Sequence, residues 1–117
     1  MVKSLRPGKP ARGSRTGRPI MVLLDLLGRR WVLRLLWELR EEPRRFRDLQ
    51  AAIGASPTIV NGRLAELRSA QLVELDRSAG YRLTPLGKEL LRLLLPLHVW
   101  SENWAKAFPG RRLHKAR

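Results

Sequence analysis

The fold of this chain is decided by residues 44–68, which read RRFRDLQAAIGASPTIVNGRLAELR. The first part of this stretch places apolar side chains at helical spacing, and Gly54 follows at a position where helices commonly end in a left-handed turn. Ser56 and Pro57 then begin a second helix, because serine caps free N–H groups and proline at the first helical position lacks only an N–H that would stay unpaired. The stretch therefore predicts two helices joined by a tight turn, the second over 56–70.

The first helix of this pair is predicted over residues 44–53, and two further helices are predicted before it. Residues 20–27 are apolar apart from Asp25, and Gly28 ends them. Residues 30–41 show the 3.6-residue period of an amphipathic helix. The apolar face of this last helix consists of Trp31, Leu35, Leu36 and Leu39.

A β-hairpin and a long C-terminal helix are predicted after the pair. Residues 73–77 and 81–83 alternate apolar and polar side chains and flank a short turn, which is typical of a hairpin. Thr84 and Pro85 repeat the start signal of a helix, which runs to Phe108 and which Pro96 kinks or breaks. The fold class is therefore mainly α with a small β-hairpin, in the winged helix-turn-helix order.

The charge of the chain is concentrated at its two ends. The 117 residues carry 24 Lys and Arg against 10 Asp and Glu, a net charge of +14, and no acidic residue lies in 1–18 or 109–117. Residues 1–18 are predicted to be a disordered basic arm, 19–108 the folded domain and 109–117 a basic tail. The arm either tracks DNA phosphates or only solubilises the protein.

Enzymatic and metal chemistry are disfavoured by composition. The chain contains no cysteine, and its two histidines, His98 and His114, lie outside zinc-binding spacings. We therefore predict no catalytic site, no metal and no cofactor. No apolar run reaches the roughly 18 to 20 residues of a membrane helix, and no apolar signal core follows the basic N-terminal residues. A cytoplasmic, nucleoid-associated protein without a membrane partner is expected.

The second helix of the pair is the predicted DNA-reading element. The N-terminal turns of this helix enter the major groove of double-stranded DNA in such folds. Its outer face is small and polar, and Gly62 is costly inside a helix unless another surface approaches closely. Arg63 has an alternative role, because it could pair with Glu66 or Asp48. The candidate DNA-binding residues are Arg44, Arg45, Ser56, Pro57, Thr58, Asn61, Gly62, Arg63, Arg68, Arg77 and Arg82.

The C-terminal helix carries more large apolar side chains than one face can bury in a chain of this length. A homodimer interface accounts for the surplus. The alternative is a pocket for a planar small-molecule effector that Trp100, Trp104 and the first helix would line. His98 is expected to be an interface or surface residue. The candidate interface residues are Leu23, Leu27, Leu90, Leu94, Leu97, Trp100 and Trp104.

From Pro19 to about Phe108 the chain resembles the HxlR family of bacterial winged-helix transcription regulators, which are relatives of the MarR regulators. The matching blocks are Leu24-Asp25-Leu26-Leu27-Gly28, Arg30-Trp31, Pro43-Arg44-Arg45-Phe46 with Leu49, Ser56 through Arg63, Leu64, Glu66 and Leu67, and Tyr81-Arg82-Leu83-Thr84-Pro85-Leu86-Gly87. The resemblance implies a homodimer that binds operator DNA, with the helices at 20–27 and 85–108 forming the interface.

Two departures limit what the resemblance implies. Family members that sense quinones or oxidants often carry a cysteine just before the proline of the first helix, where this chain has Arg18. A thiol switch is therefore excluded. The hairpin turn is also shorter than usual, being only Ser78-Ala79-Gly80, so contacts of the wing with DNA are expected to differ.

Three functions remain to be distinguished. A dimeric, sequence-specific transcriptional regulator fits the predicted helix pair best. A nonspecific architectural nucleic-acid-binding protein would derive its affinity mainly from the basic ends. A protein-interaction module with a winged fold is disfavoured by those same basic ends. Competition with random DNA separates the first two, because specific sites are typically preferred by a factor of about 10³ or more.

Overall fold

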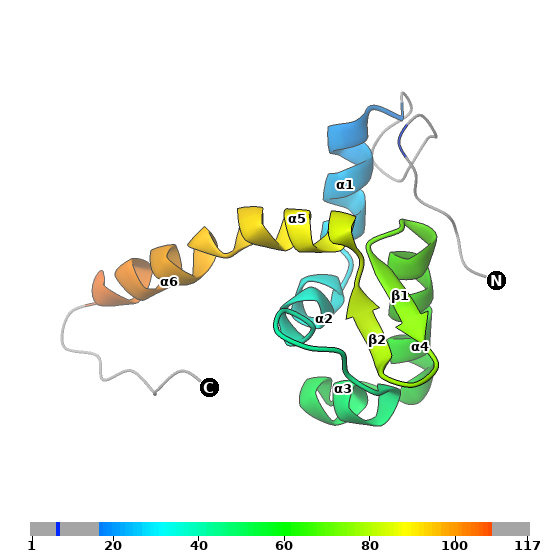
Figure 1. The fold of residues 1–117 in the computed structure, drawn as a ribbon. Coiled ribbons are helices and arrows are strands. Elements are labelled where there is room, and N and C mark those ends of the chain that lie inside the picture. Colours follow the sequence, from blue (N-terminus) through cyan, green and yellow to red (C-terminus); the bar gives the residue numbers. More distant parts are fainter. Residues whose placement is uncertain (1–6, 8–16, 109–117) are drawn as a thin grey trace.

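The computed structural model describes residue 7 and residues 17–108 of the chain. The predicted disorder of the arm and of the tail therefore falls mostly outside the described residues. Within the described part the elements are α1 (Pro19–Leu27), α2 (Val32–Glu38), α3 (Phe46–Ile53), α4 (Pro57–Ser69), β1 (Val73–Asp76), β2 (Gly80–Leu83), α5 (Pro85–Leu94) and α6 (Pro96–Lys106). Figure 1 shows α3, α4 and the hairpin gathered below α1 and α5. This is the predicted winged helix-turn-helix.

The predicted start and stop signals around the α3–α4 turn are confirmed. Gly54 follows α3 with a φ of +79°, in the left-handed region that glycine adopts without a steric penalty. The Ser56 hydroxyl accepts a hydrogen bond from the Ile59 N–H at 3.2 Å, and Pro57 is the first residue of α4. The side of α4 that carries Val60, Leu64 and Leu67 is buried, with Val60 and Leu67 fully so.

The structure shortens the predicted helix over 30–41 to Val32–Glu38. Trp31 has a φ of +79°, and a residue in the left-handed region cannot continue a right-handed helix. The helix therefore begins only after Trp31. The chain makes a tight turn before it, in which the Arg29 N–H donates to the Leu26 carbonyl at 3.1 Å.

The predicted helix over 44–53 also starts later than expected, at Phe46. The backbone of Arg44 is paired with Tyr81 in an isolated antiparallel bridge, with both N–H to carbonyl distances equal to 2.8 Å. Arg44 is thus extended and lies beside β2 rather than in the helix. The bridge joins the start of the helix pair to the hairpin.

The hairpin, residues 73–83, is called the wing below. Its register pairs Val73 with Leu83 and Asp76 with Gly80. Buried Val73 and Leu83 belong to the core, whereas Leu75 is 43% exposed. One end of the wing is therefore anchored in the core, and at its tip Arg77 and Ser78 are exposed.

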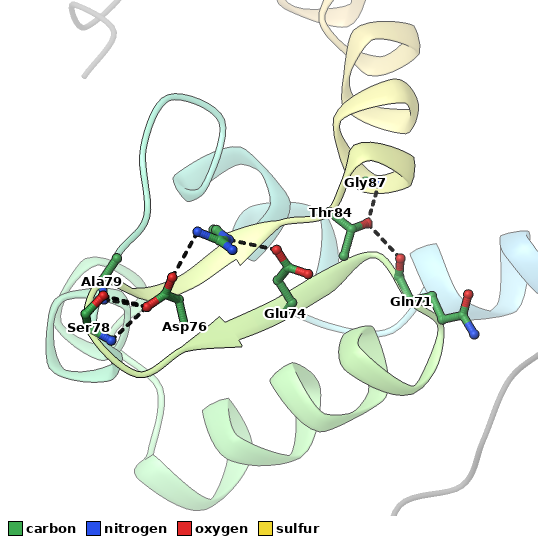
Figure 2. Close-up of polar contacts among 8 residues, drawn as sticks. Gln71, Glu74, Asp76, Ser78, Ala79, Thr84 and Gly87 are labelled. Carbon is green, nitrogen blue, oxygen red and sulfur yellow. Dashed lines mark hydrogen bonds and ion pairs between the residues drawn. The ribbon is translucent and has the colours of Figure 1, made fainter.

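A compact junction ties the anchored end of the wing to α4 and α5. The Thr84 hydroxyl donates to the Gln71 carbonyl at 2.7 Å and accepts from the Gly87 N–H at 3.0 Å (Figure 2). The Thr84 N–H also donates to the Leu72 carbonyl at 3.0 Å. A Cβ on Gly87 would lie 2.1 Å from the Leu72 carbonyl oxygen, so only glycine fits there. Backbone therefore meets backbone at this junction.

One core is shared by α1 to α5 and the wing. Its buried members are Val22, Leu26, Val32, Leu35, Leu36, Leu39, Leu49, Ile53, Val60, Leu64, Leu67, Leu72, Val73, Leu83 and Leu91. The predicted break at Pro96 is confirmed, because α5 ends at Leu94 and α6 starts at Pro96. No residue of α6 is buried, and the helix projects away from the rest of the molecule (Figure 1). None of the helices in the described part is long and apolar enough to cross a membrane.

Candidate nucleic-acid interface

Several of the candidate DNA-binding residues lie on the exposed side of α4. Pro57, Thr58 and Asn61 are exposed, and Ile59 is 44% exposed. None of these side chains is long or charged. The N-terminal half of α4 therefore presents a low, mostly uncharged surface, which another macromolecule can approach closely.

Gly62 lies in this surface and is not explained by packing within the chain. A Cβ at this position would meet no atom within 4 Å. Glycine inside a helix costs about 1 kcal/mol relative to alanine. Since alanine would fit here, the glycine is consistent with an approach from outside the chain.

Arg63 is held against the protein and does not extend from the exposed side of α4. Its Nε donates to the Arg30 carbonyl at 2.9 Å, and its Nη1 donates to both carboxylate oxygens of Glu66 at 3.1 and 3.2 Å. The pairing with Glu66, which the sequence leaves open as an alternative role, is the one observed. Arg63 thereby fastens α4 to the turn before α2.

Glu66 also binds a second arginine that sequence reasoning missed. Arg29 Nη1 lies 2.9 Å from the Glu66 carboxylate, and Arg29 Nη2 lies 3.1 Å from that of Asp25 in α1. The side chains of all three residues are only 12 to 13% exposed. The four-residue spacing of Asp25 and Arg29 is visible in the sequence, but the contact with Glu66 is not. Two arginines and two carboxylates thus join α1 to α4.

The wing tip is built around the carboxylate of Asp76. Asp76 Oδ1 accepts from the Ser78 hydroxyl and the Ser78 N–H, both at 2.7 Å, and from the Ala79 N–H at 3.1 Å (Figure 2). These hydrogen bonds, with the nearby Arg82 charge, hold the pKa of Asp76 at about 2, below its usual 3.8, and the Ser78 hydroxyl contributes most. The short turn is therefore ordered by one side chain.

The arginines of the wing and of the residues beside it differ in whether their side chains are bonded within the protein or exposed. Arg82 Nε contacts Glu74 at 2.7 Å and its Nη1 contacts Asp76 at 3.0 Å, and these carboxylates raise the pKa of Arg82. Arg45 donates to the Ser78 carbonyl, and the Nε of Arg44 is buried without a hydrogen-bond partner. Arg77 and Arg68 are exposed.

The candidate interface residues divide into two groups. Leu27, Leu90 and Leu94 are partly buried against the chain's own core, and Leu23 is half-buried on α1. The rest are exposed on α6, where Trp100 and Trp104 stack with ring centroids 5.7 Å apart. Other apolar side chains on α1 and in the segment from α5 to Phe108 are also exposed; of these, sequence reasoning counted only Phe108 in the apolar surplus. These are Ile20, Leu24, Leu86, Leu93, Leu95, Val99 and Phe108.

Two pockets lie beside these helices. One, of about 340 Å³, has walls from α1, the end of α4 with the turn that follows it, and α5, including Val22, Leu26 and Leu72. The other, of about 290 Å³, lies between α2 and the C-terminal helices, where the Trp37 ring stacks on His98 with centroids 5.8 Å apart. Neither pocket is lined by Trp100 or Trp104. No cluster of candidate metal ligands occurs among the described residues.

Comparison with known proteins agrees with this geometry. The family described as HxlR-like helix-turn-helix matches residues 26–108. The uncharacterized HTH-type transcriptional regulator YvaP of Bacillus subtilis is 30% identical over 88 residues, which cover 69% of this chain and 82% of YvaP. The quinone-bound YodB of Bacillus subtilis is similar with a TM-score of 0.66 and 29% identity, covering 73% of this chain and 97% of that one.

A second solved relative supports the same assignment. A possible HxlR family transcriptional factor from Thermoplasma volcanium GSS1 is similar with a TM-score of 0.65 and 27% identity, covering 75% of this chain and 85% of that one. The matched region contains α2 to α6, and hence both the helix pair and the wing. This chain therefore belongs to the HxlR-like helix-turn-helix family of DNA-binding transcriptional regulators.

Proposed function

We propose that the protein is a homodimeric regulator that recognises specific operator sequences by placing the N-terminal half of α4 in the major groove. The observation that carries this proposal is the exposed, uncharged surface around Gly62, where the protein leaves room for a Cβ and yet has none. A major groove about 12 Å wide admits a helix, and small side chains bring its backbone near the base edges.

The contacts divide between bases and phosphates. Thr58 and Asn61 provide hydrogen-bonding groups for base edges, and the capped N-terminus of α4 faces phosphate with its positive dipole end. Arg68 and Arg77 are exposed cations available to the phosphate backbone. Arg63 supports α4 from behind through its bonds to Glu66 and to the Arg30 carbonyl.

Dimerisation is supported by the exposed apolar side chains of the C-terminal helices. Leu93 is 75% exposed, Trp100 is 59% exposed and Trp104 is 55% exposed. Exposed apolar residues so concentrated on the two C-terminal helices favour a protein interface, since soluble monomers rarely expose large contiguous apolar patches. A second copy of the chain supplies the matching surface in a twofold assembly.

The test distinguishes contacts to base edges from contacts to phosphates. A footprint upstream of the protein's own gene locates the site, and fluorescence anisotropy over a salt series then compares that site with random DNA. Asn61→Ala is expected to weaken operator binding by about 1 to 3 kcal/mol and random binding much less. Deleting residues 1–17 is expected to weaken both alike and to flatten the salt slope by about 0.9 for each phosphate that the protein no longer neutralises.

The architectural alternative gives the opposite pattern. If the N-terminal deletion abolishes discrimination while Asn61→Ala preserves it, the basic ends bind the DNA and α4 does not read it. Asn103→Ala serves as a matched control for Asn61→Ala, because Asn103 is an exposed asparagine in a different helix, α6. This control substitution is expected to leave discrimination unchanged.

A further inference from the structure

The exposed side of α4 differs chemically from a guanine-reading surface. Around Gly62 it offers the apolar side chains of Pro57, Ile59 and Ala65, one hydroxyl and one amide, but no cation. We infer that α4 recognises A·T base pairs, with Asn61 contacting adenine and the apolar side chains contacting thymine methyl groups. This inference rests on the proposed function and specifies the class of operator that it requires.

Guanine is read in the major groove chiefly by arginine or lysine, which donate to its O6 and N7 atoms. The first two turns of α4 contain one such residue, Arg63, and three hydrogen bonds hold its guanidinium to Glu66 and to the Arg30 carbonyl. Reaching a base would break these bonds and leave Glu66, which is 12% exposed, with Arg29 alone. Arg63 is therefore withheld from the groove.

The other basic residue of α4 lies too near its C-terminus to replace Arg63. Arg68 is in the last turn, beyond the part of the helix that enters the groove, and it lines a shallow hollow with Val73 and Glu74 of β1. Arg68 is thus suited to the phosphate backbone.

An A·T pair offers what the exposed side of α4 can use. Adenine presents an N7 acceptor and an N6 donor that match the two ends of an asparagine amide, and thymine adds a methyl group that prefers apolar contact. Asn61 lies close to Gly62, where the absent side chain allows the amide to approach a base. Ile59, at 44% exposure, is an apolar side chain positioned for a methyl group.

The experiment is selection of binding sites by the full-length protein from a random DNA library, followed by anisotropy on the enriched sequence. Enrichment of A·T pairs at the positions that Asn61→Ala no longer discriminates supports the inference. Enrichment of G·C pairs at those positions overturns the inference and leaves the proposed function intact. Absence of any enriched sequence contradicts the proposed function itself.

Two substitutions, one in the DNA and one in the protein, test the individual contacts. Replacing each contacted thymine by uracil removes one methyl group and is expected to lower affinity about fourfold. Asn61→Ala is expected to lower affinity for the A·T site by roughly 5- to 150-fold. If uracil substitution has no effect at any position, the methyl contacts do not exist.

Arg63→Met tests whether Arg63 stays bonded to Glu66 or contacts a base. The methionine keeps an unbranched apolar stem but cannot donate to guanine. The variant's selected sequence is expected to be the same as that of the wild type. A G·C preference that is present in the wild type and absent from Arg63→Met would show that Arg63 leaves Glu66 to read a base. Circular dichroism of the variant establishes that the helices are retained.

Discussion

Arg29, in the turn that follows α1, lies 2.9 Å from the carboxylate of Glu66 in the C-terminal half of α4, and both side chains are almost enclosed. This contact links the helix that opens the domain to the helix that we propose faces DNA. An ion pair removed from solvent is weak evidence for stability when intact, but removing one partner leaves an uncompensated charge. Without Arg29, the Asp25 carboxylate would lose this ion pair, and Glu66 would keep its ion pair with Arg63.

Arg29→Met is therefore expected to lower the free energy of unfolding by about 1 to 3 kcal/mol. Urea unfolding followed by circular dichroism measures the change. Arg34→Met is the control, because the Arg34 side chain is 47% exposed, although it contacts Glu38 and donates to the Ala52 carbonyl. It is expected to cost at most about 1 kcal/mol. Equal effects of the two substitutions would contradict a special role for the Arg29 contact.

Gly62→Ala should separate stability from DNA binding. It is expected to raise the free energy of unfolding by up to about 1 kcal/mol, since the added methyl group meets no atom of the protein. Operator affinity is expected to fall, because the same methyl group projects into the surface proposed to meet DNA. Gly54→Ala is the contrasting control. Its free energy of unfolding should fall by about 1 to 2 kcal/mol, because φ at this position is +79°. Unchanged operator affinity in Gly62→Ala would remove Gly62 from the interface.

The Asp76 carboxylate should make the order of the wing tip depend on pH. The pKa of Asp76 is lowered in the folded protein to about 2. Its contribution to the wing is therefore complete above about pH 5 and lost as the pH falls from about 4 toward 2. NMR titration of the Ser78 and Ala79 amides measures this. Ser78→Ala is expected to move the pKa of Asp76 toward 3.8, whereas Ser101→Ala should leave it unchanged.

The Trp100→Glu, Trp104→Glu double variant tests the proposed dimer interface. Because α6 buries no residue in the single chain, the variant should keep the core and lose self-association. Sedimentation equilibrium at micromolar concentration is expected to show the mass of one chain, against twice that mass for the wild type. Leu91→Glu, at a position 6% exposed, is the control that should destabilise the core itself. A double variant that remains dimeric would place the interface elsewhere.

The parts of the fold that could be predicted depend on neighbouring residues in sequence. Gly54, Ser56 and Pro57 mark the end of one helix and the start of the next through backbone geometry that each residue favours by itself. Thr84 and Pro85 do the same for α5, and Pro96 for its end. Local conformational preferences and side-chain periodicity therefore suffice for the order of the elements.

The missed features depend on contacts between distant residues. Trp31 adopts a left-handed conformation that no tryptophan favours, so only the surrounding fold selects it. The sequence places Arg44 in a helix because its partner, Tyr81, lies 37 positions further along the chain. The Arg30 carbonyl, to which Arg63 Nε donates, lies 33 positions earlier in the chain, so this contact has no sequence signal either. The distribution of arginines between core-facing and solvent-facing roles could not be read from their positions in the chain.

The Thr84 junction holds the C-terminal end of α4 against the wing and α5. It joins the end of α4, the wing and the start of α5 through backbone contacts that the absence of a side chain at Gly87 makes possible. The 13 residues of α4 span roughly 20 Å. A rotation of about 10° at the junction would displace the far end of α4 by about 3.5 Å, close to the spacing of adjacent base pairs. In the proposed complex, this junction and the buried side chains of Val60, Leu64 and Leu67 hold α4 against such a rotation, and hence on one base pair rather than its neighbour.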